Sequence, residues 1–150
     1  MIDPRIIQFF DTQTVAGIAC VDENKIPYCF SCFYAFDEKE GLLIFKSSSG
    51  STHTLLLEQN PFVAGTVNPD RLNRLAIKGI QFQGVVEGGH DEASALYHKR
   101  YPFALAMKGE IWTVRLTWIK MTDQALGFGK KIEWRERETE TETERVRVIH

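Results

Sequence analysis

The sequence predicts a mainly β domain, a six-stranded antiparallel barrel with short helices in its connections. Three observations support this fold class. Six runs of apolar and aromatic residues have the length and composition of strands, and turn signals separate them at regular spacing. Glycines interrupt the longest run, where they are typical of a bulge or a barrel corner. A chain of 150 residues also suits one domain with a single core.

The first half of the chain begins with a short helix. Asp3 followed by Pro4 is typical of a helix cap and the first helical position, so the helix is expected to run through Phe10. A second short helix is expected around residues 55–59, where Asn60-Pro61 stops it. The strands expected in this half lie at residues 15–21, 28–36 and 42–46, with turns at 22–25 and 37–41.

The second half of the chain contains the longer strands. Asn68-Pro69-Asp70 ends the first of them. The expected elements are strands at 62–67, 75–87 and 111–121, and a helix at 91–100 capped by Asp91. Alternate positions from Trp112 to Trp118 are expected to share one face, because successive side chains of a strand point to opposite sides.

The composition excludes several classes of function. The net charge is −2, so the chain lacks the basic field on which many nucleic-acid binders depend. Its apolar runs are much shorter than a membrane span, and its first residues lack a signal-peptide pattern. Three cysteines suit a reducing compartment better than a disulfide framework. We therefore expect a cytoplasmic protein that binds neither nucleic acid nor membrane.

Two groups of reactive side chains are interpreted as structural. Cys29-Phe30-Ser31-Cys32 has the spacing of a redox motif, but a redox C-x-x-C begins a helix and this one lies in a strand-like run. We interpret the pair as buried strand cysteines. His90 and His98 lie in a polar loop and helix, and we expect them to be exposed to solvent. The histidines lack metal-site spacing with the cysteines.

The chain is expected to divide into a folded domain, residues 1–135, and a polar tail, residues 136–150. Glutamate alternates with threonine from Glu138 to Glu144, and this run has no apolar face to bury. We expect the tail to be dispensable for folding. An open alternative is that Val146, Val148 and Ile149 dock on the domain as part of a strand.

The most informative segment is the hydroxyl-rich loop from Ser47 to His53, which follows a strand and opens a helix. Hydroxyls and the free N–H groups of a helix start can converge on an anion such as phosphate. Lys46 and His53 could add positive charge. The alternative is an ordinary loop with a helix cap.

Several segments together resemble the pyridoxamine 5′-phosphate oxidase-like, FMN-binding split-barrel superfamily, and a small bacterial branch of it most closely. The matching segments are Phe33-Tyr34-Ala35-Phe36-Asp37, Val63-Ala64-Gly65-Thr66-Val67-Asn68, Gly79-Ile80-Gln81-Phe82-Gln83-Gly84, and Leu126-Gly127-Phe128-Gly129-Lys130-Lys131 with Trp134. The resemblance implies a six-stranded split barrel. It also implies a homodimer that holds two FMN molecules in clefts between its subunits.

The resemblance further implies which residues bind the cofactor. The strand end, loop and helix start that would line the flavin and hold its phosphate contain Lys46, Ser47, Ser48, Ser51, Thr52 and His53. The paired strand would face the isoalloxazine ring with Ser31, Cys32, Phe33 and Tyr34. Gln81 stands where the superfamily often has a flavin-contacting glutamine. Lys130 or Lys131 would reach the FMN of the partner subunit, with Trp134 nearby, unless these lysines belong to a plain solvated turn.

The leading functional hypothesis is an FMN-dependent oxidoreductase that acts on a small molecule. His53 stands where many relatives have a lysine. The arginines that clamp pyridoxal phosphate in the true oxidases have no matching residues in this sequence, so oxidation of pyridoxamine phosphate is not expected. A reduced nicotinamide could supply electrons from a transient site, since no G-x-G-x-x-G element is present. The alternatives are a non-catalytic module that binds a flavin (FMN, FAD or a deazaflavin) or heme, and an empty barrel used for contacts with macromolecules.

Overall fold

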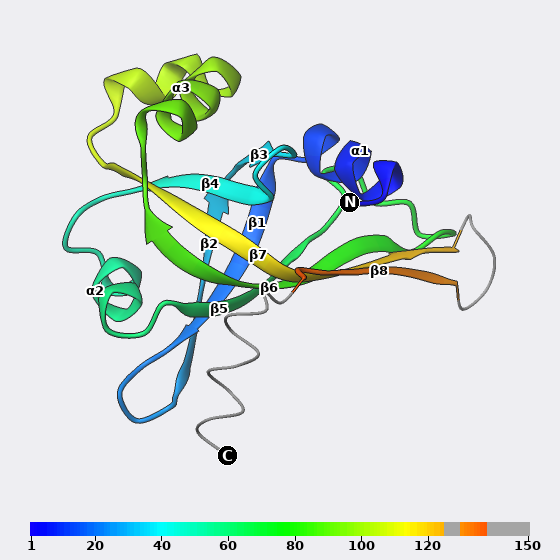
Figure 1. Cartoon of the computed structure of the whole chain (residues 1–150), viewed down its shortest axis with the longest axis horizontal. Helices are drawn as coiled ribbons and strands as arrows, with labels where there is room; N and C mark the ends of the chain where they lie inside the picture. The colour runs from blue at the N-terminus through cyan, green and yellow to red at the C-terminus, as the bar shows by residue number, and fades with distance from the viewer. Residues whose placement is uncertain (125–129, 138–150) are drawn as a thin grey trace.

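The computed structural model describes residues 1–124 and 130–137, which form one antiparallel sheet of eight strands with three α-helices and one 3₁₀ helix (Figure 1). The elements in chain order are α1 (Pro4–Thr12), β1 (Val15–Val21), β2 (Pro27–Phe33), β3 (Ala35–Asp37), β4 (Leu42–Ser47), α2 (Thr52–Gln59), β5 (Phe62–Val67), β6 (Lys78–Gly88), α3 (Asp91–Arg100), η1 (Pro102–Ala106), β7 (Glu110–Asp123) and β8 (Lys131–Arg135).

The sheet is curled into a barrel that stays open between two of its strands. The strand order is β2-β1-β5-β6-β7-β4-β3, and β8 pairs with the part of β7 beyond β4. The curl brings β2 to β4, where the ring of Phe30 lies 5.8 Å from that of Phe45. No backbone pairing joins β2 to β4 in the described residues, so a slit separates them.

The predicted fold class is confirmed, and the strand count differs for two local reasons. The strand expected at residues 28–36 is divided at Tyr34, whose side chain is buried and whose hydroxyl donates to Phe10 O at 2.7 Å. This break separates β2 from β3. The second additional strand is β8, whose charged residues gave no strand signal in the sequence.

The helices begin where side chains can accept the free N–H groups of their first turns. Asp3 caps α1 by accepting from Arg5 N at 2.9 Å, and Pro4 occupies the first turn as predicted. The cap of α3 is His90 and not Asp91, because His90 Nδ1 accepts from Ala93 N at 3.2 Å. Asp91 instead lies in the first turn, where its charge complements the helix dipole.

Two hydrophobic clusters hold the fold together. The barrel core fills the interior and includes Ile6, Phe10, Ile18, Leu43, Phe82 and Leu116. The α3 core lies on the other face of β3 and β4 and consists of Ala35, Leu42, Ile44, Ala93, Tyr97, Tyr101 and Ala104. Both faces of β4 are therefore covered, and four of its six residues are buried apolar side chains.

A bulge in β7 changes the face to which its later residues point. Gln83 pairs with Trp118, but the next residue, Gly84, pairs with Leu116, so Thr117 is the extra residue. The expectation that Trp118 shares a face with Trp112 is therefore wrong. Trp118 points outward and its indole Nε1 donates to Glu133 at 3.2 Å. A Cβ at Gly84 would lie 2.7 Å from Arg115 O, so this close approach requires glycine.

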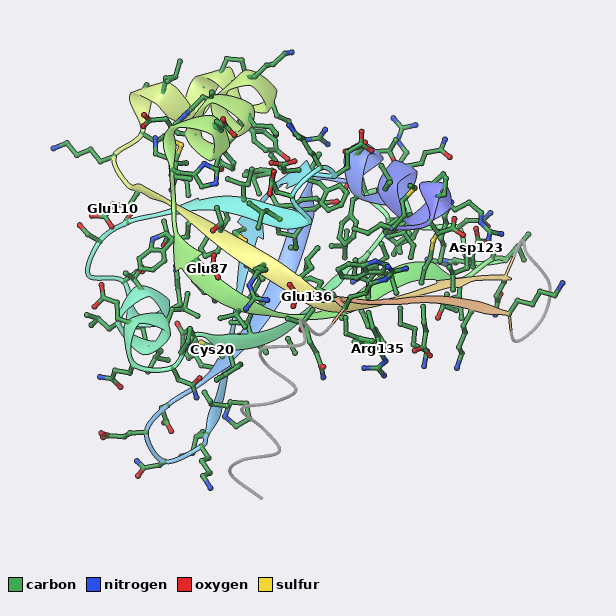
Figure 2. The ribbon with its side chains drawn as sticks, viewed as in Figure 1. Cys20, Glu87, Glu110, Asp123, Arg135 and Glu136 are labelled. Carbon is green, nitrogen blue, oxygen red and sulfur yellow. The ribbon has the colours of Figure 1, made fainter. Side chains whose placement is uncertain are left out.

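The described C-terminal residues are held to the sheet. Glu136 N donates to Thr117 O at 2.9 Å, and the Glu136 carboxylate pairs with Arg115 at 2.6 Å. Arg115 also pairs with Glu87 at 3.2 Å, on the same side of the sheet (Figure 2). Residues 138–150, most of the expected tail, lie outside the described residues.

Two other expectations can be compared with the described residues. The cysteines of the C-x-x-C sequence are not both buried, because Cys29 is exposed and Cys32 is half-buried on the edge strand β2. Among the described residues, no helix combines the length and apolar character needed to cross a membrane.

Candidate functional site

A cleft of about 290 Å³ lies at the slit between β2 and β4. Its remaining walls come from the start of α2 and from α3 with η1, which lie at the same end of the sheet (Figure 1). Seven of the residues expected from the sequence line it: Ser31, Cys32, Phe33, Lys46, Ser47, Ser48 and His53. No group of metal-ligating side chains capable of holding an ion occurs in the described part of the chain.

At the hydroxyl end of the cleft, the lining residues Ser47 and His53 belong to a hydrogen-bonded cluster that continues behind the cleft wall to Ser51 and Thr54. Thr54 Oγ1 donates its single hydrogen to Ser48 O at 3.1 Å and lies 2.7 Å from Ser51 Oγ, which must therefore donate to it. Ser51 Oγ in turn caps α2 by accepting from Thr54 N at 3.4 Å. These two hydroxyls are committed to the fold and fix the start of α2.

Ser47 and His53 hold the remaining hydrogen-bonding freedom of this cluster. Ser47 Oγ is hydrogen-bonded to His53 Nε2, and the His53 ring stacks on Phe30 at 3.9 Å and 12°. Burial lowers the pKa of His53, so the ring is neutral near pH 7. When Nε2 carries the hydrogen, His53 donates to Ser47 and the Ser47 hydroxyl is released to donate into the cleft. The tautomer of His53 therefore decides what Ser47 offers a ligand.

Lys46 belongs to the opposite end of the cleft. It precedes Ser47 in β4, so its side chain leaves the other face of the strand. Its ammonium donates to Ala104 O at 2.7 Å and lies 3.1 Å from His98 Nε2. The expectation of a solvent-exposed His98 is wrong, because the ring is half-buried between Lys46 and Ser94.

The other predicted site residues lie outside this cleft within one chain. Ser51 is the cap just described, Thr52 is exposed at the first position of α2, and Tyr34 is buried in the barrel core. Gln81 is exposed on β6 and, through Thr66 and Gly17, occupies the same cross-strand row as Ser31.

The late segment is also remote from the cleft in the single chain. Lys130 and Lys131 are exposed at the start of β8, and residues 125–129 of the glycine-containing turn lie outside the described residues. Trp134 packs on the barrel core and lines a separate hollow of about 700 Å³ next to α1. The role of the two lysines toward a partner subunit stays a prediction.

Sequence reasoning missed one wall of the cleft. The missed lining residues are Phe30, Tyr97, Phe103, Ala104, Met107 and Lys108, and Thr54 and His98 contact the lining residues Ser48 and Lys46. All but Phe30 and Thr54 come from α3, η1 and the two residues that follow η1, which reach the cleft only through long-range packing. One usable signal was present: the segment after Pro102 carries apolar residues that no predicted strand or helix needed.

The sequence relatives identify the family. A UPF0306 protein of Photorhabdus laumondii is 43% identical over 119 residues, which are 77% of this chain and 83% of that protein. The chain belongs to the UPF0306 family. A UPF0306 protein of Yersinia pseudotuberculosis is 36% identical over 136 residues, 88% of this chain and 92% of that protein. No protein-family model matches the chain.

Solved structures show the fold of this UPF0306 chain. A heme-binding protein from Mycobacterium smegmatis superposes with a TM-score of 0.71 at 15% identity over 90% of this chain, which spans 60% of that structure. An FAD-binding protein from Mesorhizobium loti superposes with a TM-score of 0.67 at 14% identity, and the match covers 82% of this chain and 95% of that protein's chain.

A third structure places the fold in a named group. A protein of the pyridoxinephosphate oxidase family from Clostridium acetobutylicum gives a TM-score of 0.63 at 13% identity, with 87% of this chain and 92% of its own covered. At these identities the likeness concerns the fold alone. The fold is the split barrel of pyridoxamine 5′-phosphate oxidase-like proteins, as the sequence resemblance implied.

Proposed function

We propose that this protein binds FMN in the cleft between β2 and β4 and uses it as an oxidoreductase on a small molecule. One observation carries the proposal: a hydroxyl cluster at a helix start and an aromatic wall line the same cavity. This combination suits a ligand with a phosphate at one end and a flat ring at the other. Structural neighbours that bind FAD or heme make a flat cofactor a reasonable occupant of this fold.

The hydroxyl end fits a phosphate without a compensating cation. The first N–H groups of α2 have no partners within the helix, and Ser47 can add a hydroxyl when His53 Nε2 carries the hydrogen. Neutral donors at a helix start bind phosphate well because the helix dipole adds partial positive charge. Neutral His53 therefore acts as a hydrogen-bonding partner and not as a counter-ion.

The rest of the cleft fits the ring. Phe30 and Cys32 supply apolar surface from β2, which also offers the backbone groups of an edge strand. When bound, FMN supplies the hydride and electron transfer itself. The residues of this chain would hold the phosphate, orient the ring and limit the access of water.

A homodimer belongs to the same proposal. The cavity of about 290 Å³ is at the lower limit of ligand pockets, so a flavin would extend beyond it. None of the seven residues of β2 is buried, although strands normally bury one face. Tyr28 on β2 and Val15 on the neighbouring β1 are 40% and 41% exposed. A second copy of the chain would cover this surface and complete two equivalent sites.

Heme is disfavoured by the state of the side chains that could ligate its iron. Burial raises the pKa of Cys32 to about 12, so its sulfur is a protonated thiol and a weak ligand. His98 Nε2 accepts from Lys46, and His53 is stacked on Phe30 with Nε2 bonded to Ser47. A heme ligated by a histidine or cysteine of this cleft would have to displace one of these contacts.

Spectroscopy and paired titrations test the proposal. The purified protein should be yellow and release FMN, and FMN should bind at least about tenfold more tightly than riboflavin, because riboflavin lacks the phosphate. Bleaching by a reduced nicotinamide would separate an enzyme from a carrier. Light scattering should report a dimer. Equal affinity for the two flavins, or a Soret band in the purified protein, would overturn the proposal.

A further inference from the structure

The ammonium of Lys46 is held in place before any ligand binds. It donates to Ala104 O at 2.7 Å and to His98 Nε2 at 3.1 Å. A lysine ammonium has three N–H donors, so one remains for a ligand in the cleft that Lys46 lines. Fixing a long side chain in advance lowers the entropy that a ligand must lose on binding.

The hydrogen bonds of His98 determine its tautomer. His98 Nδ1 lies 2.9 Å from Ser94 O, and a carbonyl oxygen can only accept, so Nδ1 carries the hydrogen. In the neutral ring Nε2 then has its lone pair free and accepts from Lys46. His98 is therefore a positioning residue, fixed by its own helix, that aims the ammonium of Lys46.

Lys46 is a cation without a carboxylate. Within residues 1–124 and 130–137 the ion pairs join Arg5, Lys78 and Arg115 to acids, and none involves Lys46. Both of its partners are uncharged in the arrangement described above, and the side chain is only half-exposed. An anionic ligand would supply the missing negative charge.

The surroundings of Lys46 indicate the class of anion. A single free N–H can donate to one oxygen of a carboxylate, and the hydroxyl end already provides the several donors from which a phosphate can accept. Beside Lys46 the mouth of the cleft carries three exposed apolar side chains, Phe33, Phe103 and Met107 at 47%, 57% and 57%, together with the exposed Lys108. The rings of Phe33 and Phe103 are in edge-to-face contact at 6.1 Å. A flat apolar group attached to the carboxylate would bury this surface.

We infer that Lys46 and His98 form a second anion subsite in the cleft, which takes the carboxylate of a small aromatic substrate. This inference rests on the proposed function, because it names the substrate class of the same cleft. It also gives Lys46 a role different from the one that the sequence resemblance implied. The resemblance implies that Lys46 helps to hold the flavin and its phosphate. In the present inference Lys46 binds the substrate, and Ser47, on the opposite face of β4, faces the phosphate.

Calorimetric titration with benzoate, an aromatic carboxylate, tests the subsite without requiring turnover. Benzamide is the matched ligand, since it has the same shape and no charge. Benzoate should bind the full-length protein at least about tenfold more tightly than benzamide, because a hydrogen bond between charged groups is lost with the amide. Equal binding of the two ligands would overturn the inference.

Two substitutions locate the effect. Lys46→Met keeps the stem and removes the charge, and should weaken benzoate by about tenfold or more. Lys99→Met removes the same charge from an exposed position next to His98 and should leave benzoate unchanged. Thermal unfolding of both variants establishes that they fold. If Lys46→Met instead abolishes the preference for FMN over riboflavin, Lys46 is a phosphate ligand and the inference is wrong.

The role of His98 is tested by a rescue. His98→Leu removes the acceptor for Lys46, and should weaken benzoate severalfold. His98→Gln can still accept from Lys46 and donate to Ser94 O, and should restore binding; failure of the rescue would contradict the positioning role. Failure of the proposed function is distinguishable, because benzoate binding by a protein that binds no FMN supports the subsite and contradicts only the flavin.

Discussion

The two ends of the cleft offer hydrogen bonds to a ligand by different means, although adjacent residues of one strand build them. At the hydroxyl end, Ser47 and neutral His53 present hydrogen bonds beside a helix start. At the other end, Lys46 presents a charge that His98 aims. The difference follows from the alternation of side chains along β4, which sends consecutive residues to opposite faces. Neighbours in sequence therefore need not serve the same group of a ligand.

The largest expected effect concerns Cys32, on the wall that both ends share. Burial raises the pKa of its thiol to about 12, so little thiolate exists at pH 8. Iodoacetamide should therefore alkylate Cys32 at least about a hundredfold more slowly than the exposed Cys29. A time course by mass spectrometry measures both rates, and Cys29→Ser isolates the slow one. Equal rates would show that the cleft is open to water throughout.

The next largest effect concerns the contribution of the Ser47 hydroxyl to FMN binding. Ser47→Ala removes the hydroxyl that bonds His53 and faces the cleft, and should weaken FMN by about ten- to a hundredfold. Riboflavin should lose nothing, because it has no phosphate. Ser49→Ala, at an exposed position of the same loop, is the control. Equal losses for FMN and riboflavin would mean that Ser47 serves the ring end of the cofactor.

A smaller effect, on stability, distinguishes two threonines of α2. Thr54 is buried and its hydroxyl joins Ser51 and Ser48, so Thr54→Val should lower the free energy of unfolding by about 1 to 2 kcal/mol. Thr52 is exposed, and Thr52→Val should change the free energy of unfolding by less than about 0.5 kcal/mol. Urea denaturation measures both. A large loss at Thr52 would place it in contacts that the single chain does not provide, such as those of a dimer.

The smallest effect is a pH dependence at His53. Burial lowers the pKa of the folded-state ring below its ordinary value of 6.5, so the unfolded chain binds the proton more readily. The contribution of His53 to stability is therefore complete above pH 6.5 and is lost as the pH falls through the folded-state pKa. Urea denaturation of the wild type and of His53→Gln, compared between pH 7.5 and 5.5, should show a steeper decline for the wild type. Parallel declines would contradict a buried neutral ring.

Local signals in the sequence predicted the parts of the fold that local interactions determine. The cap and first turn of α1 follow from Asp3 and Pro4, and the loop before α2 from its hydroxyls. The glycines of the long strand predicted irregularity, and the pairing does shift at Gly84. The hydroxyl end of the cleft could be anticipated for the same reason, because its residues are close in the sequence.

Long-range packing determined what the sequence could not predict. His98 is half-buried because Lys46 of β4, 52 residues earlier in the chain, contacts its ring. The bulge at Thr117 reversed the alternation in β7, and no residue type marks it within β7 itself. These outcomes depend on how distant elements meet, which periodicity in one segment does not contain.

β7 couples the two hydrophobic clusters of the molecule. Its 14 residues pair with β6 along one side and with β4 and then β8 along the other. Val114 and Ile119 lie in the barrel core, while Ile111 packs on the α3 core. If either cluster unfolded, β7 would lose packing contacts that also support the other cluster. The two clusters are therefore expected to unfold together as one cooperative unit. The walls of the cleft, drawn from both clusters, therefore share a single folding transition.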